Sequence, residues 1–166
     1  MIKKIIILFV FLWVISPLQA YAQNSDKTLF LMVPEGVSEY VENGKGEKRV
    51  LVLFDIGCKG CHEKFISLLK LDAESRQAVT TIFHSDKVIE FKRYIRSFNE
   101  IPIKIIYNSE SQYELMQSLK PYGVKPWRYL PRVILIDENN KVYGQGNHSA
   151  DNIKKFLSLG LEKQSN

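Results

Sequence analysis

The sequence contains only two cysteines in 166 residues, Cys58 and Cys61. No cysteine lies within the apolar segment at the N-terminus or directly after it, so the lipid anchor of a bacterial lipoprotein is not expected. The formal net charge is +5, but no run of lysine or arginine occurs, so nothing indicates nucleic-acid binding. Internal repeats and low-complexity segments are also absent, and the length suits one domain.

The N-terminal segment has the pattern of a secretory signal. Two lysines precede an apolar core over residues 5–15, and Ala20-Tyr21-Ala22 forms a small-x-small cleavage site. We therefore expect residues 1–22 to be a signal peptide that is cut before Gln23. An uncleaved anchor stays open as the alternative, because the segment is apolar nearly to residue 22 and a membrane span needs about 20 residues.

Residues 23–166 would then form the mature domain, with a formal charge of +3 because two lysines leave with the signal. A signal peptide predicts a periplasmic or otherwise extracytoplasmic location. In that environment disulfides persist, so a cysteine pair can cycle only if another molecule supplies or removes electrons.

Both cysteines lie where a buried strand is expected to meet a helix. Residues 50–54 are uninterrupted apolar and rich in β-branched side chains, which is typical of a strand covered on both faces. After a short turn, Cys61 recurs with Phe65, Leu68 and Leu69 at helical spacing. The sequence therefore predicts a Cys-x-x-Cys pair at the N-terminus of a helix.

This position favours thiol chemistry, because the thiolate is the reactive form of cysteine and a helix N-terminus stabilises negative charge. Cys58 is expected to be the exposed nucleophile and Cys61 the shielded resolving thiol. Lys59 adds a positive charge that favours the thiolate further.

Two other readings of the motif remain open. A disulfide closing so short a loop could be a structural staple, although such a bridge stabilises little. Alternatively, Cys58-Lys59-Gly60-Cys61-His62 matches the haem-attachment sequence of c-type cytochromes. The strand before the motif argues against a haem pocket, and His62 is then a solvent-facing helix residue.

The rest of the chain alternates strands and helices. Strands are expected over residues 28–33, 78–83, 101–107, 131–136 and 141–145, and helices over 35–42, 86–98, 110–120 and from 150 to a stop at Gly160. Ser85, a Ser109–Gln112 capping box and Ser149 are the expected helix N-caps. This order predicts an α/β fold with a central mixed β-sheet flanked by helices.

The combination of features resembles the thioredoxin superfamily, and specifically its secreted or membrane-anchored thiol-disulfide oxidoreductases of the TlpA/ResA type. Three features carry the resemblance: the strand, Cys-x-x-Cys and helix unit; Tyr122-Gly123-Val124 followed by Leu130-Pro131 leading into a strand; and Gly144-Gln145-Gly146 before the last helix. It covers about residues 28–160. It implies a thioredoxin-like fold, with residues 101–120 as an inserted strand and helix.

The resemblance also implies site residues. Pro131 would be a cis-proline facing the disulfide, Leu130 would offer backbone to a substrate chain, and Gly146 would complete the rim. The chain departs from the family in having Gly57 where tryptophan usually precedes the first cysteine. The acidic residue that assists proton transfer in many members has no certain counterpart, since Asp55 is better suited to capping a turn.

The expected function is therefore thiol-disulfide exchange outside the cytoplasm. The resemblance implies that the protein reduces its substrates. The substrates would be exported proteins with cysteines, and a membrane electron donor, or an oxidase for the reverse direction, would recycle the pair. No cofactor, metal or nucleic acid is expected, and the protein is expected to be a monomer. A haem-carrying cytochrome and a redox-inert binding module are the alternative functions.

Overall fold

The structure is a computed structural model that describes residues 29–31, 34–108 and 111–159. The expected signal peptide, Ser109 and the helix stop at Gly160 lie outside these residues. None of the helices within the described ranges is long and apolar enough to cross a membrane.

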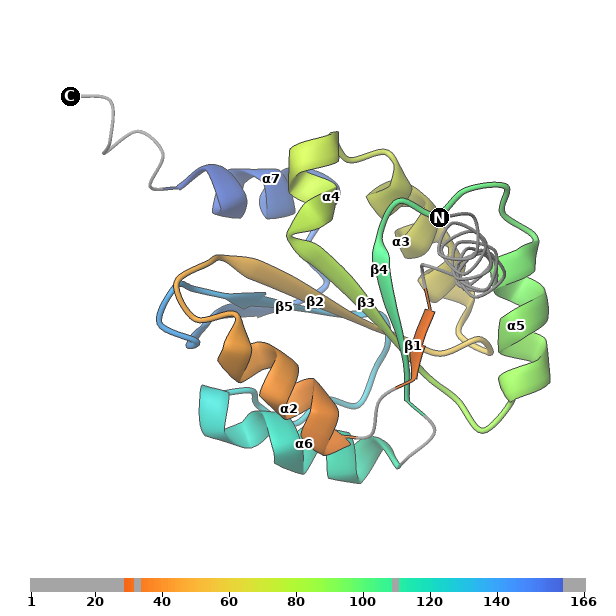
Figure 1. Cartoon of the computed structure of the whole chain (residues 1–166), viewed down its shortest axis with the longest axis horizontal. Coiled ribbons are helices and arrows are strands. Elements are labelled where there is room, and N and C mark those ends of the chain that lie inside the picture. The colour runs from red at the N-terminus through yellow and green to blue at the C-terminus, as the bar shows by residue number, and fades with distance from the viewer. Residues whose placement is uncertain (1–28, 32–33, 109–110, 160–166) are drawn as a thin grey trace, which may run out of the picture.

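Six strands form one mixed sheet in the order β1-β4-β3-β2-β5-β6 (Figure 1). Strands β1, β4, β3 and β2 run parallel to one another, whereas β5 pairs antiparallel with both β2 and β6. The mixed sheet predicted from the sequence is therefore confirmed. The strands are Leu29–Leu31 (β1), Arg49–Phe54 (β2), Val79–His84 (β3), Lys104–Asn108 (β4), Arg132–Ile136 (β5) and Val142–Gly146 (β6).

Helices cover both faces of the sheet, as Figure 1 shows. One layer contains α3 (Lys59–Leu69), α4 (Ala73–Gln77), α5 (Val88–Arg96) and α7 (Ala150–Ser158). The other layer contains α2 (Pro34–Asn43) and α6 (Gln112–Leu119), with a 3-10 turn at Lys120–Tyr122. The expected strand and helix over residues 101–120 are therefore β4, which lies between β1 and β3, and α6, which packs beside α2.

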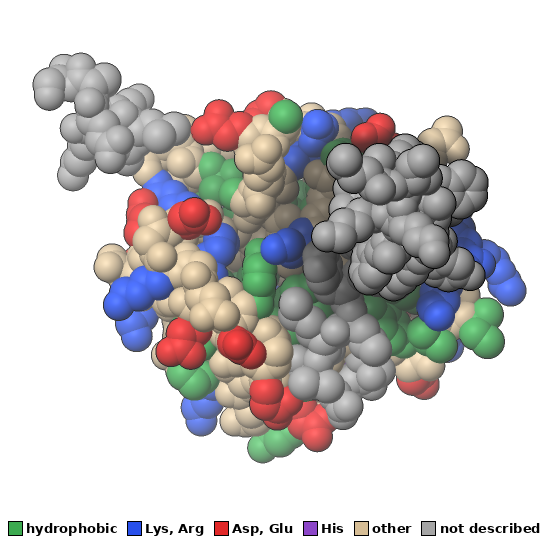
Figure 2. All heavy atoms as spheres, viewed as in Figure 1, with side chains coloured by type: hydrophobic (Ala, Val, Ile, Leu, Met, Phe, Trp, Pro, Cys, Tyr) green, Lys and Arg blue, Asp and Glu red, His purple; other side chains and the backbone are tan. Residues whose placement is uncertain are grey.

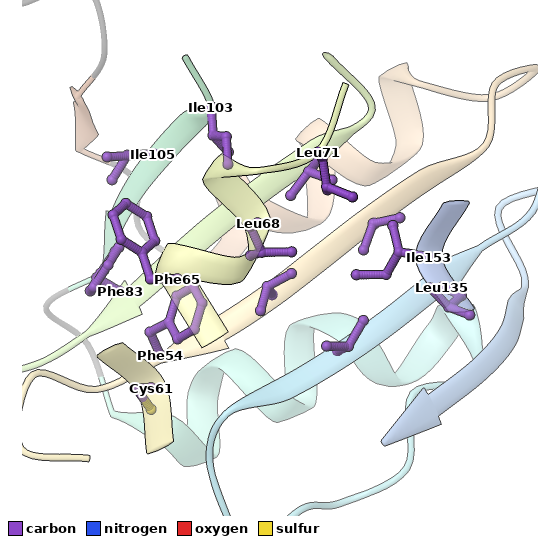
Figure 3. Close-up of a cluster of buried hydrophobic side chains, with 14 of the residues drawn as sticks. Phe54, Cys61, Phe65, Leu68, Leu71, Phe83, Ile103, Ile105, Leu135 and Ile153 are labelled. Atoms are coloured by element: carbon purple, nitrogen blue, oxygen red, sulfur yellow. The ribbon is translucent and has the colours of Figure 1, made fainter. Parts of the chain in front are cut away.

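The position of β2 inside the sheet explains why its sequence is apolar from Val50 to Phe54. All six of its residues are buried, because alternate side chains enter the cores on the two faces of the sheet. Val52 and Phe54 face the layer of α3, and Leu51 and Leu53 face the layer of α2. Figure 3 shows the first of these cores, with Cys61 at one end of the row formed by Phe65 and Leu68.

Several local expectations need correction. The short helix α4 was not expected; Asp72 caps it by accepting the Ser75 backbone N–H. Ser85 does not cap α5, because its hydroxyl accepts the N–H of Lys87 in a turn before the helix. The capping box of α6 is formed by Ser111 and Glu114 rather than by residues 109 and 112. The N-cap role of Ser149 is confirmed.

Arg49 connects three elements at the end of the sheet away from the cysteines. Its side chain is 5% exposed and donates hydrogen bonds to the backbone carbonyls of Tyr40 and Val41 at the end of α2. It also donates to the side chain of Asn140 in the turn between β5 and β6. Burial lowers the pKa of Arg49 from its ordinary value, but the guanidinium stays charged because its ordinary pKa is so high. The charge interacts favourably with the C-terminal end of the α2 dipole.

We expect Arg49→Met to lower the free energy of unfolding by about 2–4 kcal/mol, because buried carbonyls and the Asn140 amide lose their donor. Chemical denaturation of the oxidised protein would measure the change. Lys45→Met is the matched control, since Lys45 is exposed in the adjacent turn and its loss should change stability by less than about 0.5 kcal/mol. Equal effects of the two substitutions would contradict the role given to Arg49.

Candidate redox site

The pairing of β2 with β5 determines where the site lies. The two strands are antiparallel and Leu53 is opposite Arg132, so the end of β2 is beside the start of β5. Cys58 follows β2 after a three-residue segment, and Pro131 directly precedes β5. Antiparallel pairing therefore brings together segments that are more than seventy residues apart in the sequence.

The turn between β2 and α3 is held by Asp55. Its carboxylate Oδ1 accepts the backbone N–H of Gly57 at 2.7 Å, and its carbonyl accepts the N–H of Cys58 at 3.2 Å. Cys58 then takes the N-cap position of α3. The predicted turn-capping role of Asp55 is confirmed, and the predicted helix start at Cys58 is confirmed with it.

A disulfide joins Cys58 and Cys61, whose Cα atoms are 5.3 Å apart. The two residues differ in exposure: Cys58 is half-buried, whereas Cys61 is 3% exposed and packs in the core beside Phe65. An incoming sulfur can therefore reach Cys58 more easily than Cys61, which is the asymmetry that the helical spacing predicted.

The segment Leu130-Pro131 lies directly against this disulfide. Its peptide bond is cis, as the family resemblance implied. The Sγ of Cys58 is 3.3 Å from the carbonyl oxygen of Leu130, so a reduced Cys58 could donate its S–H to that oxygen. Gly60 faces the other residue of the segment, because a Cβ at Gly60 would lie 3.5 Å from Cδ of Pro131.

Gly146 is placed at the same end of the sheet, opposite Val133 at the start of β5. Its nearest side chain is His148, which lies over Gly144 and Gly146. That Gly146 contacts a substrate stays a prediction, as do the substrate contacts of Leu130 and Pro131 and the effect of Lys59 on the thiolate.

The structure adds a group of basic residues that the sequence did not point to: Lys64, Arg132 and His148. The ammonium of Lys64 donates to the carbonyl oxygen of His148 at 2.7 Å, and burial lowers the pKa of Lys64. Burial also lowers the pKa of His148, and the charges of Lys64 and Arg132 lower it further. His148 is therefore neutral at pH 7. Helical spacing could have placed Lys64 one turn after Cys61. No local sequence pattern predicts that Arg132 and His148 lie close to Lys64.

His62 is exposed, as expected, and its Nδ1 lies 3.0 Å from the hydroxyl of Tyr94 on α5. Burial raises the pKa of Tyr94 to about 12, so the hydroxyl stays protonated and can donate to the imidazole. Across the described ranges, no three His, Cys, Asp or Glu side chains are grouped so that they could hold a metal ion.

The difference in exposure leads to a prediction about the reduced protein. At mildly acidic pH, alkylation with iodoacetamide should modify Cys58 roughly tenfold faster than Cys61, because the helix N-terminus favours the Cys58 thiolate and Cys61 is buried. Peptide mapping by mass spectrometry after short reaction times would measure both rates. Faster labelling of Cys61 would reverse the roles given to the two cysteines.

Among the comparisons with known proteins, only the search of solved structures gave matches. A scan against protein-family models and a search of curated proteins gave no match. Among solved structures, a thioredoxin-family thiol:disulfide interchange protein from Chlorobium tepidum TLS aligns with a TM-score of 0.56 and 16% identity, over 72% of this chain and 83% of its own.

Two further structures give a similar result. The pneumococcal exposed lipoprotein thioredoxin of Streptococcus pneumoniae strain TIGR4 aligns with a TM-score of 0.54 and 19% identity, over 70% of this chain and 87% of its own. A thiol:disulfide interchange protein from Bacteroides sp. aligns with a TM-score of 0.52 and 16% identity, over 74% of this chain and 81% of its own. Together with the mixed sheet, its helical layers and the cysteine helix, these alignments show that the chain has the fold of the thioredoxin superfamily.

Proposed function

We propose that this protein is an exported thiol-disulfide oxidoreductase that exchanges its Cys58–Cys61 disulfide with cysteines of exported proteins. The observation that carries the proposal is the pairing of a half-buried sulfur with a buried one at the start of α3, directly opposite Leu130-Pro131. A purely structural staple gains nothing from leaving one sulfur accessible.

In the reducing direction, the Cys58 thiolate attacks one sulfur of a substrate disulfide. The substrate S–S bond breaks, one substrate sulfur leaves as a thiolate, and a mixed disulfide joins Cys58 to the other. The Cys61 thiolate then attacks Cys58, which releases the second substrate sulfur and re-forms the Cys58–Cys61 disulfide. Two electrons pass from the protein to the substrate, and the two released thiolates take up protons.

The surroundings of Cys58 support its role as the attacking sulfur. It is the N-cap of an eleven-residue helix, so backbone N–H groups and the helix dipole favour its thiolate. The neighbouring Lys59 adds an exposed positive charge. Leu130 presents its carbonyl oxygen to the same sulfur, which would favour the protonated thiol and so act in the opposite direction.

Leu130, Pro131 and Gly146 are proposed to border the substrate groove, with Leu130 offering backbone groups to the substrate chain. The proposed direction is reduction. Because the chain has no further cysteine, a membrane electron donor would have to reduce the pair after each turnover, whereas an oxidase would serve the reverse direction. The proposed location is periplasmic or otherwise extracytoplasmic, and the protein would act as a monomer.

No observation favours the two alternative functions. Haem attachment would use both sulfurs in bonds to the porphyrin, but here they are bonded to each other, and the His62 imidazole interacts with Tyr94. A redox-inert binding module would not need one sulfur to be more accessible than the other.

The mechanism predicts which cysteine carries the intermediate. Reduced Cys61→Ser mixed with insulin should accumulate a stable mixed disulfide at Cys58, because the resolving thiol is missing. Cys58→Ser is the matched control and should accumulate at least about tenfold less, since its remaining thiol is buried. Mass spectrometry without reductant would quantify both adducts. Equal adduct formation, or none with either variant, would contradict the mechanism.

A further inference from the structure

Beside the disulfide, the loop before Pro131 exposes two side chains that the fold does not use. Tyr129 is 82% exposed and Arg128 is also exposed. Both are next to residues that are fixed in place: Trp127 is 5% exposed in the core of the α2 layer, and Leu130 packs against both cores. An aromatic side chain this exposed contributes little to stability, but it is typical of binding surfaces.

The backbone of this loop is held from two sides. Gln112 on α6 donates to the carbonyl of Trp127 at 3.2 Å. Gln145 on β6 accepts the N–H of Lys125 at 2.8 Å and donates to its carbonyl at 3.0 Å. Arg128 and Tyr129 are therefore displayed from an anchored segment, close to the reactive sulfur. The Cα of Tyr129 is about 3.8 Å from that of Leu130, whose carbonyl oxygen is 3.3 Å from Cys58 Sγ.

The residues next to Cys58 and next to Leu130-Pro131 include two cations whose side chains are unpaired among the described residues. Within the described parts of the chain, Lys59 and Arg128 form no hydrogen bond or ion pair, and both are exposed. Two carboxylates are nearby in sequence: Asp55 accepts a backbone N–H within the turn, and Glu63 is exposed one helical turn after Lys59.

This charge does not extend over the whole molecule. On the face shown in Figure 2, carboxylates gather over α2, where Glu35, Glu39 and Glu42 are exposed along one side of the helix. The exposed side of α2 is therefore opposite in charge to Lys59 and Arg128.

From these observations we infer that Lys59, Arg128 and Tyr129 form a docking rim for polypeptide segments that carry acidic residues next to the cysteine to be exchanged. The two cations attract the flanking carboxylates and Tyr129 covers the segment beside the sulfur. This inference rests on the proposed function and specifies its substrate class. Because the rim is exposed, the attraction acts mainly on encounter and is weakened by salt.

The test uses three single-cysteine peptides, each supplied as its own disulfide-linked dimer, with the cysteine flanked by two Glu, two Gln or two Lys residues. The reduced protein transfers two electrons to each dimer, releasing two peptide thiols and forming its own Cys58–Cys61 disulfide. Each rate is divided by the rate with dithiothreitol, an uncharged reductant, to remove differences in the peptides' own reactivity.

We expect the normalised rate at low salt to be about tenfold higher for the Glu dimer than for the Lys dimer, with Gln between them. The ratio of the Glu rate to the Lys rate should shrink towards one in 0.5 M salt, because the Debye length there is only about 3–5 Å. Arg128→Glu should reverse the order of the Glu and Lys dimers. Lys141→Glu is the charge-matched control: Lys141 is exposed in the β5–β6 turn at the other end of the sheet, and this variant should keep the wild-type ratio.

Tyr129→Ala should lower the exchange rate with all three dimers about fivefold without changing the ratios between these rates, as expected for a contact that is independent of charge. Equal normalised rates for the three dimers, or an unchanged order in Arg128→Glu, would overturn the docking rim while leaving the proposed function in place. If the reduced protein exchanged with none of the dimers, the proposed function would fail, and this inference with it.

Discussion

The antiparallel pairing of β2 with β5 is the constraint on which the site depends. It places the end of a completely buried strand beside the start of another, so that Cys58 and Leu130 come within contact distance. Because both strands are inside the sheet, with cores on both faces, this arrangement is fixed by the apolar packing of both cores. A change in the register of β5 would move Pro131 away from Gly60 and turn core residues towards the wrong face.

The helix that follows β2 converts this fixed position into a chemical difference between two sulfurs. The first turn of α3 leaves Cys58 half-buried at the N-terminus of the helix, and directs Cys61 into the core with Phe65 and Leu68. The same packing that stabilises α3 thus shields one sulfur. Lys59 directly follows the accessible cysteine, and the exposed Arg128 and Tyr129 directly precede Leu130, whose carbonyl oxygen contacts its sulfur.

Much of this arrangement could be predicted from the sequence, because it depends on local patterns. The apolar run of β2 and the helical spacing after Cys61 identified the strand, the helix and the accessible cysteine, while the family resemblance supplied Pro131. The five-residue helix α4 is too short to give a periodic signal. The cap of α5 was misplaced because Ser85, the serine just before that helix, uses its hydroxyl in the preceding turn. The cap of α6 was misplaced because Ser109 and Ser111 both precede that helix, and only the fold decides which hydroxyl meets a free N–H. The approach of Lys64, Arg132 and His148 joins α3, β5 and the start of α7, and no local pattern encodes it.

The central claim is that the folded protein passes reversibly between a Cys58–Cys61 disulfide and a dithiol. Its most direct test is the equilibrium reduction potential of the pair, measured by titrating the protein against glutathione redox buffers. A reductase with this site should give a single two-electron transition, with a potential closer to about −270 mV, the value for thioredoxin, than to about −120 mV, the value for a strong disulfide oxidant. A value near the latter would contradict the reducing direction. A disulfide that opened only when the protein unfolded would contradict the redox function itself.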